Sequence, residues 1–343
     1  MRWNSLLAAL LILAALPAAS ANLPTPALLV HRRKYAMGTV FDIVAYTDSE
    51  QRASAAIDAA FQEIVTLDGV MSNFKPDSDL SRLNNTAHFH RQNVLPDLYR
   101  VVAESLRYSR MSGGKFDISV GPLTDLWKAS ARGQPVPSAS ELRRLRLCVG
   151  YSKIRMVPPD GIEFLSACLR IDLGAIGKGY AVDRAVALLR AHGIRCAVIN
   201  AGGSTIFGMG VPPGQKGWAV TLRDPSHRVH AWVLLHNTAV STSEQTAPSL
   251  LGNKRIGHII DPATGLPVHA TFAVTALAQS ATAADALSTT LLLVGPKAGK
   301  RLVATAGRTA AIWISPGGQT ITASSGPQIY VDAANSSSSG GPR

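Results

Sequence analysis

Apolar residues recur along this chain with two different spacings, and together they predict helices and strands in mixed order. Helical spacing marks three stretches: Ile57, Phe61 and Ile64 within 50–70; Leu98, Val101, Val102 and Ser105; and Val182, Ala185, Val186 and Leu189. Strand-like alternation marks three others: 37–46; Trp218, Val220 and Leu222; and Phe272, Val274 and Ala276. This order favours an α+β fold, with mixed, largely antiparallel sheets and packed helices, over a regular parallel sheet.

The N-terminus has the pattern of an export signal. Arg2 precedes an unbroken apolar run at Leu6–Leu16, and Ala19-Ser20-Ala21 then offers a cleavage site. We expect residues 1–21 to be a cleaved signal peptide, because the apolar run is too short to span a bilayer comfortably; an uncleaved anchor is the alternative. Export predicts a periplasmic protein in an oxidising compartment, with association with the inner membrane left open. Residues 335–343 are expected to form a flexible tail.

Composition narrows the classes of partner. A chain of 343 residues with 46% hydrophobic content can bury a large core. Its net charge of +12 suggests attraction to nucleic acid, to a membrane surface or to a phosphorylated small molecule. The Lys and Arg residues are scattered and aromatic residues make up only 6%, so we do not expect nucleic acid as a partner.

The chain contains three cysteines, Cys148, Cys168 and Cys196. An odd number without a CxxC pair argues against a zinc site. One disulfide with one free thiol and three buried free thiols are about equally favoured, since an isolated cysteine behaves as a small hydrophobe. A catalytic cysteine is the least favoured alternative.

A glycine-rich turn precedes the helix that carries Val182. Its glycines, Gly174, Gly177 and Gly179, follow G-x-x-G-x-G, which is neither the dinucleotide-binding pattern nor a P-loop. The simplest interpretation is a tight strand-to-helix connection that uses the backbone freedom of glycine. Lys178 argues for a bound anion instead, because a cation at the start of a helix is unfavourable with the helix dipole unless an anion lies between them.

Two further stretches carry candidate chemistry. Asp285 and Thr289 lie one turn apart in a helix predicted over 279–296, and their oxygens suit Mg²⁺. A capping box at Thr282-x-x-Asp285 explains the same residues equally well. His258 precedes a turn in HIIDPATGLPV; a lone histidine is more often structural, but beside a phosphate it could accept a proton.

Six ordered motifs resemble the FAD:protein FMN transferase (ApbE) family. They are MGT at 37–39, MSNFKPDSDLSRLN at 71–84, GGKFDISVGPLTDLW at 113–127, IDLGAIGKGYAVDRA at 171–185, HIIDPATGLPV at 258–268 and ADALSTT at 284–290. The resemblance covers about Tyr35 to Val331 and implies one catalytic domain over residues 22–334.

The resemblance also implies an activity and a site. Such proteins use FAD as substrate and Mg²⁺, move FMN onto a Thr or Ser hydroxyl of a partner flavoprotein, and release AMP. The acceptor is expected to be a subunit of a membrane redox complex or a periplasmic FMN-binding domain. Positions matching FAD contacts are Met37, Phe74, Lys115, Phe116, Asp117, Asp172, Lys178, His258 and Ile260. The metal ligands would be the Ala175 carbonyl, Asp285 and Thr289. The implied catalytic residues are His258, as the base, and Asp285.

The chain departs from the family pattern at three places. Glu244 stands where many relatives have Gly, Gly202-Gly203 is followed by Ser204 rather than Asp, and Phe74 stands where relatives often carry Tyr. These departures keep two alternatives open. One is a Mg²⁺-dependent FAD pyrophosphatase that gives FMN and AMP, and the other is a non-catalytic periplasmic FAD-binding protein.

Overall fold

The computed structural model describes residues 28–245, 249–251, 254–268 and 272–332. The expected signal peptide at 1–21 and the expected tail at 335–343 lie outside these residues, so both stay predictions.

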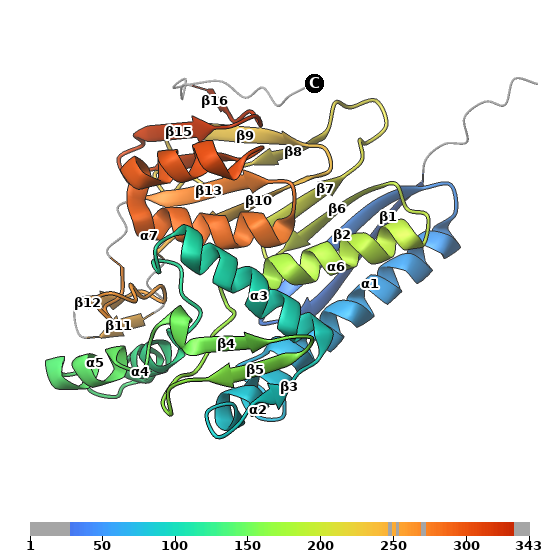
Figure 1. Cartoon of the computed structure of the whole chain (residues 1–343). Coiled ribbons are helices and arrows are strands. Elements are labelled where there is room, and N and C mark those ends of the chain that lie inside the picture. The colour runs from blue at the N-terminus through green and yellow to red at the C-terminus, as the bar shows by residue number, and fades with distance from the viewer. Residues whose placement is uncertain (1–27, 246–248, 252–253, 269–271, 333–343) are drawn as a thin grey trace, which may run out of the picture.

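An eight-stranded sheet forms the centre of the molecule (Figure 1). Its strands, in spatial order, are β1 (Leu28–Ala36), β2 (Thr39–Thr47), β6 (Cys196–Ala201), β7 (Thr205–Met209), β10 (Thr238–Ser243), β13 (Ala273–Ala278), β14 (Ala310–Ile314) and β15 (Thr320–Ser324). Every neighbouring pair is antiparallel, which confirms the predicted α+β class.

Helices cover one face of this sheet (Figure 1). They are α1 (Glu50–Met71), α6 (Gly177–Ala191) and α7 (Ala281–Ala306), with α3 (Pro96–Met111) beside α7. The predicted apolar stripes face the core: Ile57, Ile64, Leu98, Val101, Val182, Ala185 and Leu189 are all fully buried. Within the described residues, none of these helices combines the length and the apolar character that a bilayer span requires.

A smaller sheet packs on the other face of the large one. It consists of β8 (Trp218–Thr221), β9 (His230–Leu235) and β16 (Tyr330–Asp332). Val233 and Leu235 of β9 meet Val240 and Ile312 of the large sheet in a second apolar cluster. Because β10, β13 and β14 are covered on both faces in this region, their residues are almost continuously buried.

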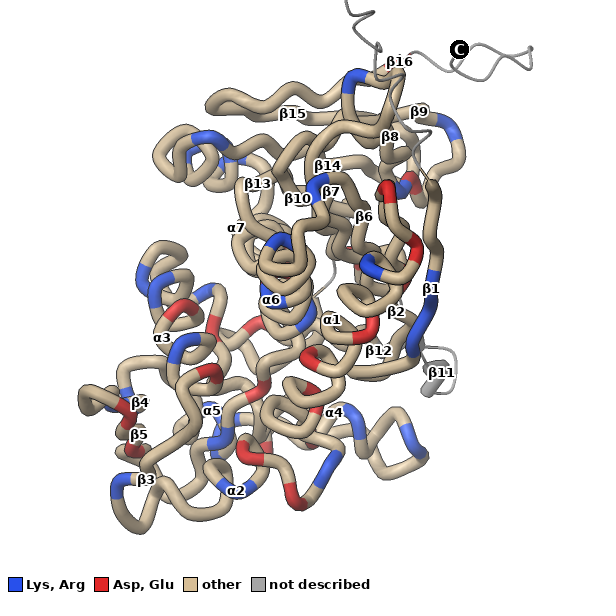
Figure 2. The backbone as a smooth tube through the Cα atoms, turned by 90° about the vertical axis from the view of Figure 1, so that its right-hand side faces the viewer, with Lys and Arg blue, Asp and Glu red and all other residues tan. Residues whose placement is uncertain are grey.

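The remaining elements form the lower part of the molecule in Figure 1. They are α2 (Asp79–Thr86), α4 (Gly121–Ala131), α5 (Ala139–Arg146), the strands β3 (Gln92–Asn93), β4 (Ile154–Val157) and β5 (Gly161–Phe164), and the hairpin of β11 (Ser249–Leu251) and β12 (Lys254–Ile256). Basic and acidic residues are spread over many elements, with short basic runs on β1 and α5 (Figure 2).

One predicted boundary is incomplete and another is wrong. The helix expected to end at Gly295-Pro296 does break at Gly295, which leaves the helical region (φ 71°), but a second helical stretch then continues α7 to Ala306. Proline is well suited to the first turn of the renewed helix, where no N–H is needed. The strand expected from Met37 begins at Thr39, because Met37 (φ 50°) and Gly38 (φ 74°) form the turn between β1 and β2.

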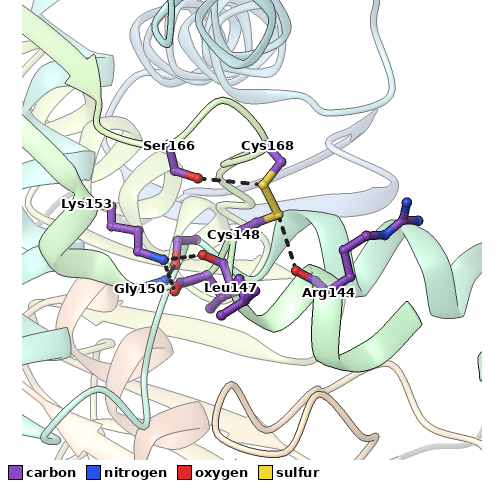
Figure 3. The surroundings of a disulfide bond; sticks show 9 residues. Arg144, Leu147, Cys148, Gly150, Lys153, Ser166 and Cys168 are labelled. Carbon is purple, nitrogen blue, oxygen red and sulfur yellow. Dashed lines mark hydrogen bonds between the residues drawn. A yellow bond between two sulfur atoms is a disulfide. The ribbon is translucent and has the colours of Figure 1, made fainter. Parts of the chain in front are cut away.

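The cysteines resolve into one disulfide and one free thiol. Cys148 and Cys168 are bridged and Cys196 is unbridged. The bridge joins the segment after α5 to the segment after β5, and Lys153 donates to the Leu147 carbonyl beside it (Figure 3). Of the two alternatives left open by the sequence, the first is therefore the one observed.

Candidate active site at the N-termini of α6 and α7

The glycine-rich turn enters α6 and is held by its own backbone. The Leu173 carbonyl accepts the N–H groups of Ile176 (3.1 Å) and Gly177 (2.8 Å). Asp172 Oδ1 accepts the N–H of Gly174 at 2.8 Å. Met37 packs against the start of the helix, since a Cβ added to Gly177 would lie 3.6 Å from its Cε. Met37 and Asp172, far apart in the sequence, thus meet at this turn.

Gly179 brings α6 into close contact with α7. A Cβ at this position would lie 2.3 Å from the Ala281 carbonyl oxygen, closer than real atoms approach, so only glycine fits. The Gly179 N–H donates to Asp285 Oδ2 at 2.9 Å. Gly179 lies in the first turn of α6, whose N–H groups have no acceptor within the helix, and Asp285 supplies that acceptor. The Ala175 carbonyl precedes the N-cap residue Ile176, so it lies outside the hydrogen-bond ladder of α6.

Asp285 and Thr289 project from one face of α7 towards β10, as their spacing predicts. Asp285 is 4% exposed and its Oδ1 accepts from Ser241 Oγ at 3.3 Å. Thr289 Oγ1 lies 3.0 Å from Ser243 Oγ. Carboxylate and hydroxyl oxygens of α7 thus lie against the hydroxyl groups of β10, and oxygen donors of this kind fit a hard cation such as Mg²⁺.

The capping-box interpretation of Asp285 is wrong. The N-cap of α7 is Ser280, whose side chain accepts from the Ala283 N–H at 3.1 Å. Thr282 lies inside the first turn, and its hydroxyl donates to Asp183 of α6 instead. The local pattern T-x-x-D therefore has no capping role, and Asp285 faces the inter-helix site.

β10 and its continuation align the site with the His258 segment. Ser241, Ser243 and Gln245 alternate along the chain, so their side chains point the same way. Gln245 binds both backbone groups of Ile259: its Oε1 accepts the Ile259 N–H at 3.2 Å and its Nε2 donates to the Ile259 carbonyl at 3.4 Å. This contact holds the exposed His258 at the end of β10, beyond Ser243.

Two lysines lie beside the turn. Lys178 Nζ donates to the Gly174 carbonyl at 3.3 Å. Lys128 of α4 donates to Asp172 Oδ2 at 3.3 Å and lies 5.0 Å from the centre of the Phe74 ring. Phe74 itself is 74% exposed, so its ring is accessible to a planar ligand. The outer side of the turn therefore combines positive charge with an exposed aromatic face.

The three residues of the Lys115-Phe116-Asp117 segment have different surroundings. Lys115 Nζ pairs with both carboxylate oxygens of Asp261, at 3.1 and 2.9 Å. Phe116 is buried against Tyr108. Burial raises the pKa of Asp117, while hydrogen bonds from Ser119 and the Tyr151 N–H lower it.

The Phe116 and Asp117 side chains are thus buried in the protein interior, whereas Lys115 is partly exposed and pairs with Asp261. The segment runs beside the turn, since the Ile118 carbonyl accepts the Asp172 N–H at 2.7 Å.

Ile260 is also buried, in a small cluster with Leu123 and Trp127. The Trp127 indole donates to the Gly265 carbonyl at 2.7 Å and so fixes the turn that follows His258. Ile260 therefore orients the His258 loop, and its side chain packs against α4.

Sequence reasoning missed Lys128, Ser241, Ser243, Gln245 and Asp183. All five residues of the STSEQ run are polar, so the run has no alternation that singles out Ser241, Ser243 and Gln245. Nothing in the local pattern around Lys128 or Asp183 indicates their partners, which lie far away in the chain.

The geometry defines a class of protein: an antiparallel α+β fold with a buried oxygen-donor site next to a cationic turn. Within the described residues, no three His, Cys, Asp or Glu side chains form a group that could hold a metal ion. A cation here would instead use one carboxylate with hydroxyl and carbonyl oxygens. That set suits hard, oxygen-preferring ions.

The chain belongs to the ApbE family, whose profile matches residues 37–313. The FAD:protein FMN transferase of Klebsiella pneumoniae is 31% identical over 277 residues, covering 78% of this chain and 79% of the relative. The flavin transferase ApbE from Vibrio cholerae superposes with a TM-score of 0.77 at 28% identity, covering 88% of this chain and 99% of that one. The ApbE protein from Thermotoga maritima gives a TM-score of 0.77 at 25% identity, covering 86% and 97%.

Gly179→Ala should destabilise the protein by about 1–3 kcal/mol, because the added methyl group meets backbone that cannot move aside. Gly69→Ala is the matched control. Gly69 lies inside α1 with open space around it, so the same substitution should stabilise by about 0.5–1 kcal/mol. Urea unfolding of the three proteins measures both effects. Equal stability of the two variants would contradict the close helix contact.

Proposed function

We propose that this chain is an exported, Mg²⁺-dependent FAD:protein FMN transferase. It moves FMN from FAD onto a Thr or Ser hydroxyl of a partner flavoprotein and releases AMP. The observation that carries the proposal is the juxtaposition of an oxygen-donor site (Asp285, Thr289 and the Ala175 carbonyl) with a cationic turn (Lys128 and Lys178) in a member of the ApbE family.

Asp285, Thr289 and the Ala175 carbonyl would hold the Mg²⁺. The ion typically takes one or two protein groups and completes its shell with phosphate and water. When bound, it neutralises the pyrophosphate and stabilises charge on the leaving AMP. Ser241 and Ser243 support the site from β10, where Ser241 donates to Asp285 and Ser243 contacts Thr289.

The cationic turn would receive the pyrophosphate. Lys178 lies in the first turn of α6, where the positive end of the helix dipole also favours an anion. Its ammonium group now donates to the Gly174 carbonyl, a partner that a phosphate oxygen can replace. The exposed ring of Phe74 next to Lys128 offers a stacking surface for a ring of the dinucleotide.

The transfer step exchanges one P–O bond for another. The acceptor hydroxyl oxygen forms a bond to the FMN-side phosphorus, and the bond from that phosphorus to the bridging oxygen breaks. AMP leaves with the bridging oxygen and its electron pair, and the hydroxyl proton passes to the base. The protein positions the two reactants and neutralises charge, as in phosphoryl transfer generally.

His258 is the favoured base, with Asp261 as the alternative. Asp261 is held by both bonds from Lys115, and its Oδ1 also accepts the Ala263 N–H at 2.9 Å. Both carboxylate oxygens of Asp261 are thus already engaged by protein donors. His258 is exposed and lies next to Ile259, which Gln245 holds.

The Cys148–Cys168 disulfide supports export, because disulfides persist in oxidising compartments such as the periplasm. The proposed acceptor is accordingly a periplasmic FMN-binding domain or a subunit of a membrane redox complex.

One assay separates the transferase from a FAD pyrophosphatase and from a non-catalytic binding protein. The protein is incubated with FAD, Mg²⁺ and a candidate acceptor flavoprotein. A transferase gives AMP with covalent flavin on the acceptor, a pyrophosphatase gives AMP and free FMN, and a binding protein gives neither.

Asp285→Ala should lower the transfer rate by about 10²–10³-fold, by analogy with the loss of one transition-state stabiliser. Thr289→Ala should also slow transfer and raise the Mg²⁺ concentration needed for half-maximal rate. Thr290→Ala is the matched control, since the Thr290 hydroxyl donates to the Ala286 carbonyl of its own helix. A folded Asp285→Ala variant with normal turnover would remove Asp285 from the metal site.

Lys178→Glu should weaken FAD binding strongly, and more at low salt, where screening is least. Lys178→Gln should have a milder effect, because the helix dipole remains. Riboflavin, which lacks phosphate, should bind the three proteins alike. Fluorescence titration with both flavins tests this, and undiminished FAD binding by Lys178→Glu would show that the turn does not face the pyrophosphate.

His258→Asn should slow transfer while FAD affinity stays near that of the wild type, because the substitution removes the proton acceptor and keeps a polar group. The pH–rate profile should lose the limb that reports the base. Rates are measured over a pH series with saturating FAD and acceptor. If rate and profile are both unchanged, the base is a different group, and Asp261→Asn is the next variant to measure.

A further inference from the structure

Asp183 of α6 binds the first turn of α7. Its Oδ1 accepts the Ala281 N–H at 2.8 Å, and its Oδ2 accepts both the Thr282 N–H at 2.8 Å and the Thr282 hydroxyl at 2.5 Å. A helix leaves its first four N–H groups without partners in the helix. In α7 the Ser280 hydroxyl accepts the N–H of Ala283, and the ordinary helical bonds begin with Ala284 N–H to the Ser280 carbonyl. The N–H groups of Ala281 and Thr282 are therefore capped from α6, and that of Ala283 from Ser280.

The contact is reciprocal. Asp285 of α7 accepts the Gly179 N–H in the first turn of α6, just as Asp183 of α6 accepts N–H groups in the first turn of α7. Gly179 and Asp183 are four residues apart, as are Ala281 and Asp285, so each pair lies on one face of its helix. Each helix thus supplies the carboxylate that caps the other, across the contact that Gly179 makes possible.

We propose that Asp183 is a positioning residue for the oxygen-donor site. By fixing where α7 begins relative to α6, it sets Asp285 and Thr289 at the right place next to the Ala175 carbonyl. The inference rests on the metal site of the proposed function. Asp183 acts through the α7 backbone, since its two oxygens already accept three hydrogen bonds.

The Asp183 side chain points towards α7, and this orientation supports the role. Asp183 is followed by Arg184, which turns away from α7 and pairs with Glu63 of α1 at 2.7 Å. Burial raises the pKa of Asp183, and the hydrogen bonds from Thr282 and Ala281 oppose that rise. Burying a carboxylate costs free energy unless hydrogen-bond donors compensate it. The donors here are the N–H groups of Ala281 and Thr282, which an apolar side chain at position 183 would leave without this acceptor.

The test measures metal affinity separately from stability. Mn²⁺ is titrated into the full chain with saturating FAD, and binding is followed by electron paramagnetic resonance; urea unfolding gives stability. Asp183→Ala should weaken Mn²⁺ binding by about 10–100-fold, the usual effect of losing a residue that orients a ligand. Asp183→Asn, which keeps one acceptor oxygen, should lie between Asp183→Ala and the wild type and serves if Asp183→Ala does not fold.

Leu189→Ala is the matched control. Leu189 is fully buried on α6, more than a turn beyond Asp183, and contacts the apolar core. Its truncation should lower the urea concentration at the midpoint of unfolding and leave Mn²⁺ affinity unchanged. If Leu189→Ala weakens Mn²⁺ binding as much as Asp183→Ala does, general destabilisation explains the effect and the inference is wrong.

A double-mutant cycle with Asp285 completes the test. In an Asp285→Ala background, Asp183→Ala should lower Mn²⁺ affinity little further, because the ligand that it positions is gone. If wild type and Asp285→Ala bind Mn²⁺ equally, the proposed metal site is wrong and this inference fails with it. If Asp285→Ala loses Mn²⁺ while Asp183→Ala binds as tightly as wild type, only the positioning role is overturned.

Discussion

The close contact of α6 with α7 at Gly179 is the constraint on which the site depends. Without a side chain at 179, the two helix N-termini approach until a carboxylate from each reaches the amides of the other. Both carboxylates lie where helix dipoles favour negative charge, so the arrangement stabilises the buried charges that it creates. The same contact gives the Gly179 N–H, a first-turn donor of α6, its acceptor and fixes Asp285 beside the start of α6.

Strand β10 of the large sheet supplies the hydroxyl groups that contact Asp285 and Thr289. β10 is buried between two layers, and its alternation sends Ser241 and Ser243 towards α7. Thr242, between them, points the other way and contacts Thr275 of β13 at 2.7 Å. The helix period spaces Asp285 and Thr289 by one turn, and the strand period matches each with a hydroxyl. The rise per residue differs between a helix and a strand. Asp285 can therefore face Ser241 while Thr289 faces Ser243 only if β10 is held in one register, and its antiparallel neighbours fix that register.

Local patterns in the sequence were enough to predict the helices, the class of fold and the Asp285–Thr289 pair, because each depends on residues close together in the chain. The capping box failed because T-x-x-D is also a local pattern, whereas the true partner of Thr282 is Asp183, about a hundred residues earlier. The end of the helix at Gly295 was predicted correctly as a break, but proline then begins a second helical stretch. Phe116 and Asp117 could not be recognised as buried without the neighbouring Tyr108 and Tyr151, which only the fold brings to them.

The charges around the turn explain why one place can attract ions of both signs. Lys115 and Lys128 are each paired with a carboxylate, Asp261 and Asp172, so these pairs add little net charge. Lys178 is paired with a carbonyl dipole of the turn. The partners of Asp285 are instead an amide and a hydroxyl. In the function proposed above, one metal-bound pyrophosphate would place its phosphate oxygens at Lys178 and its cation at Asp285, so that both sites would bind parts of a single ligand.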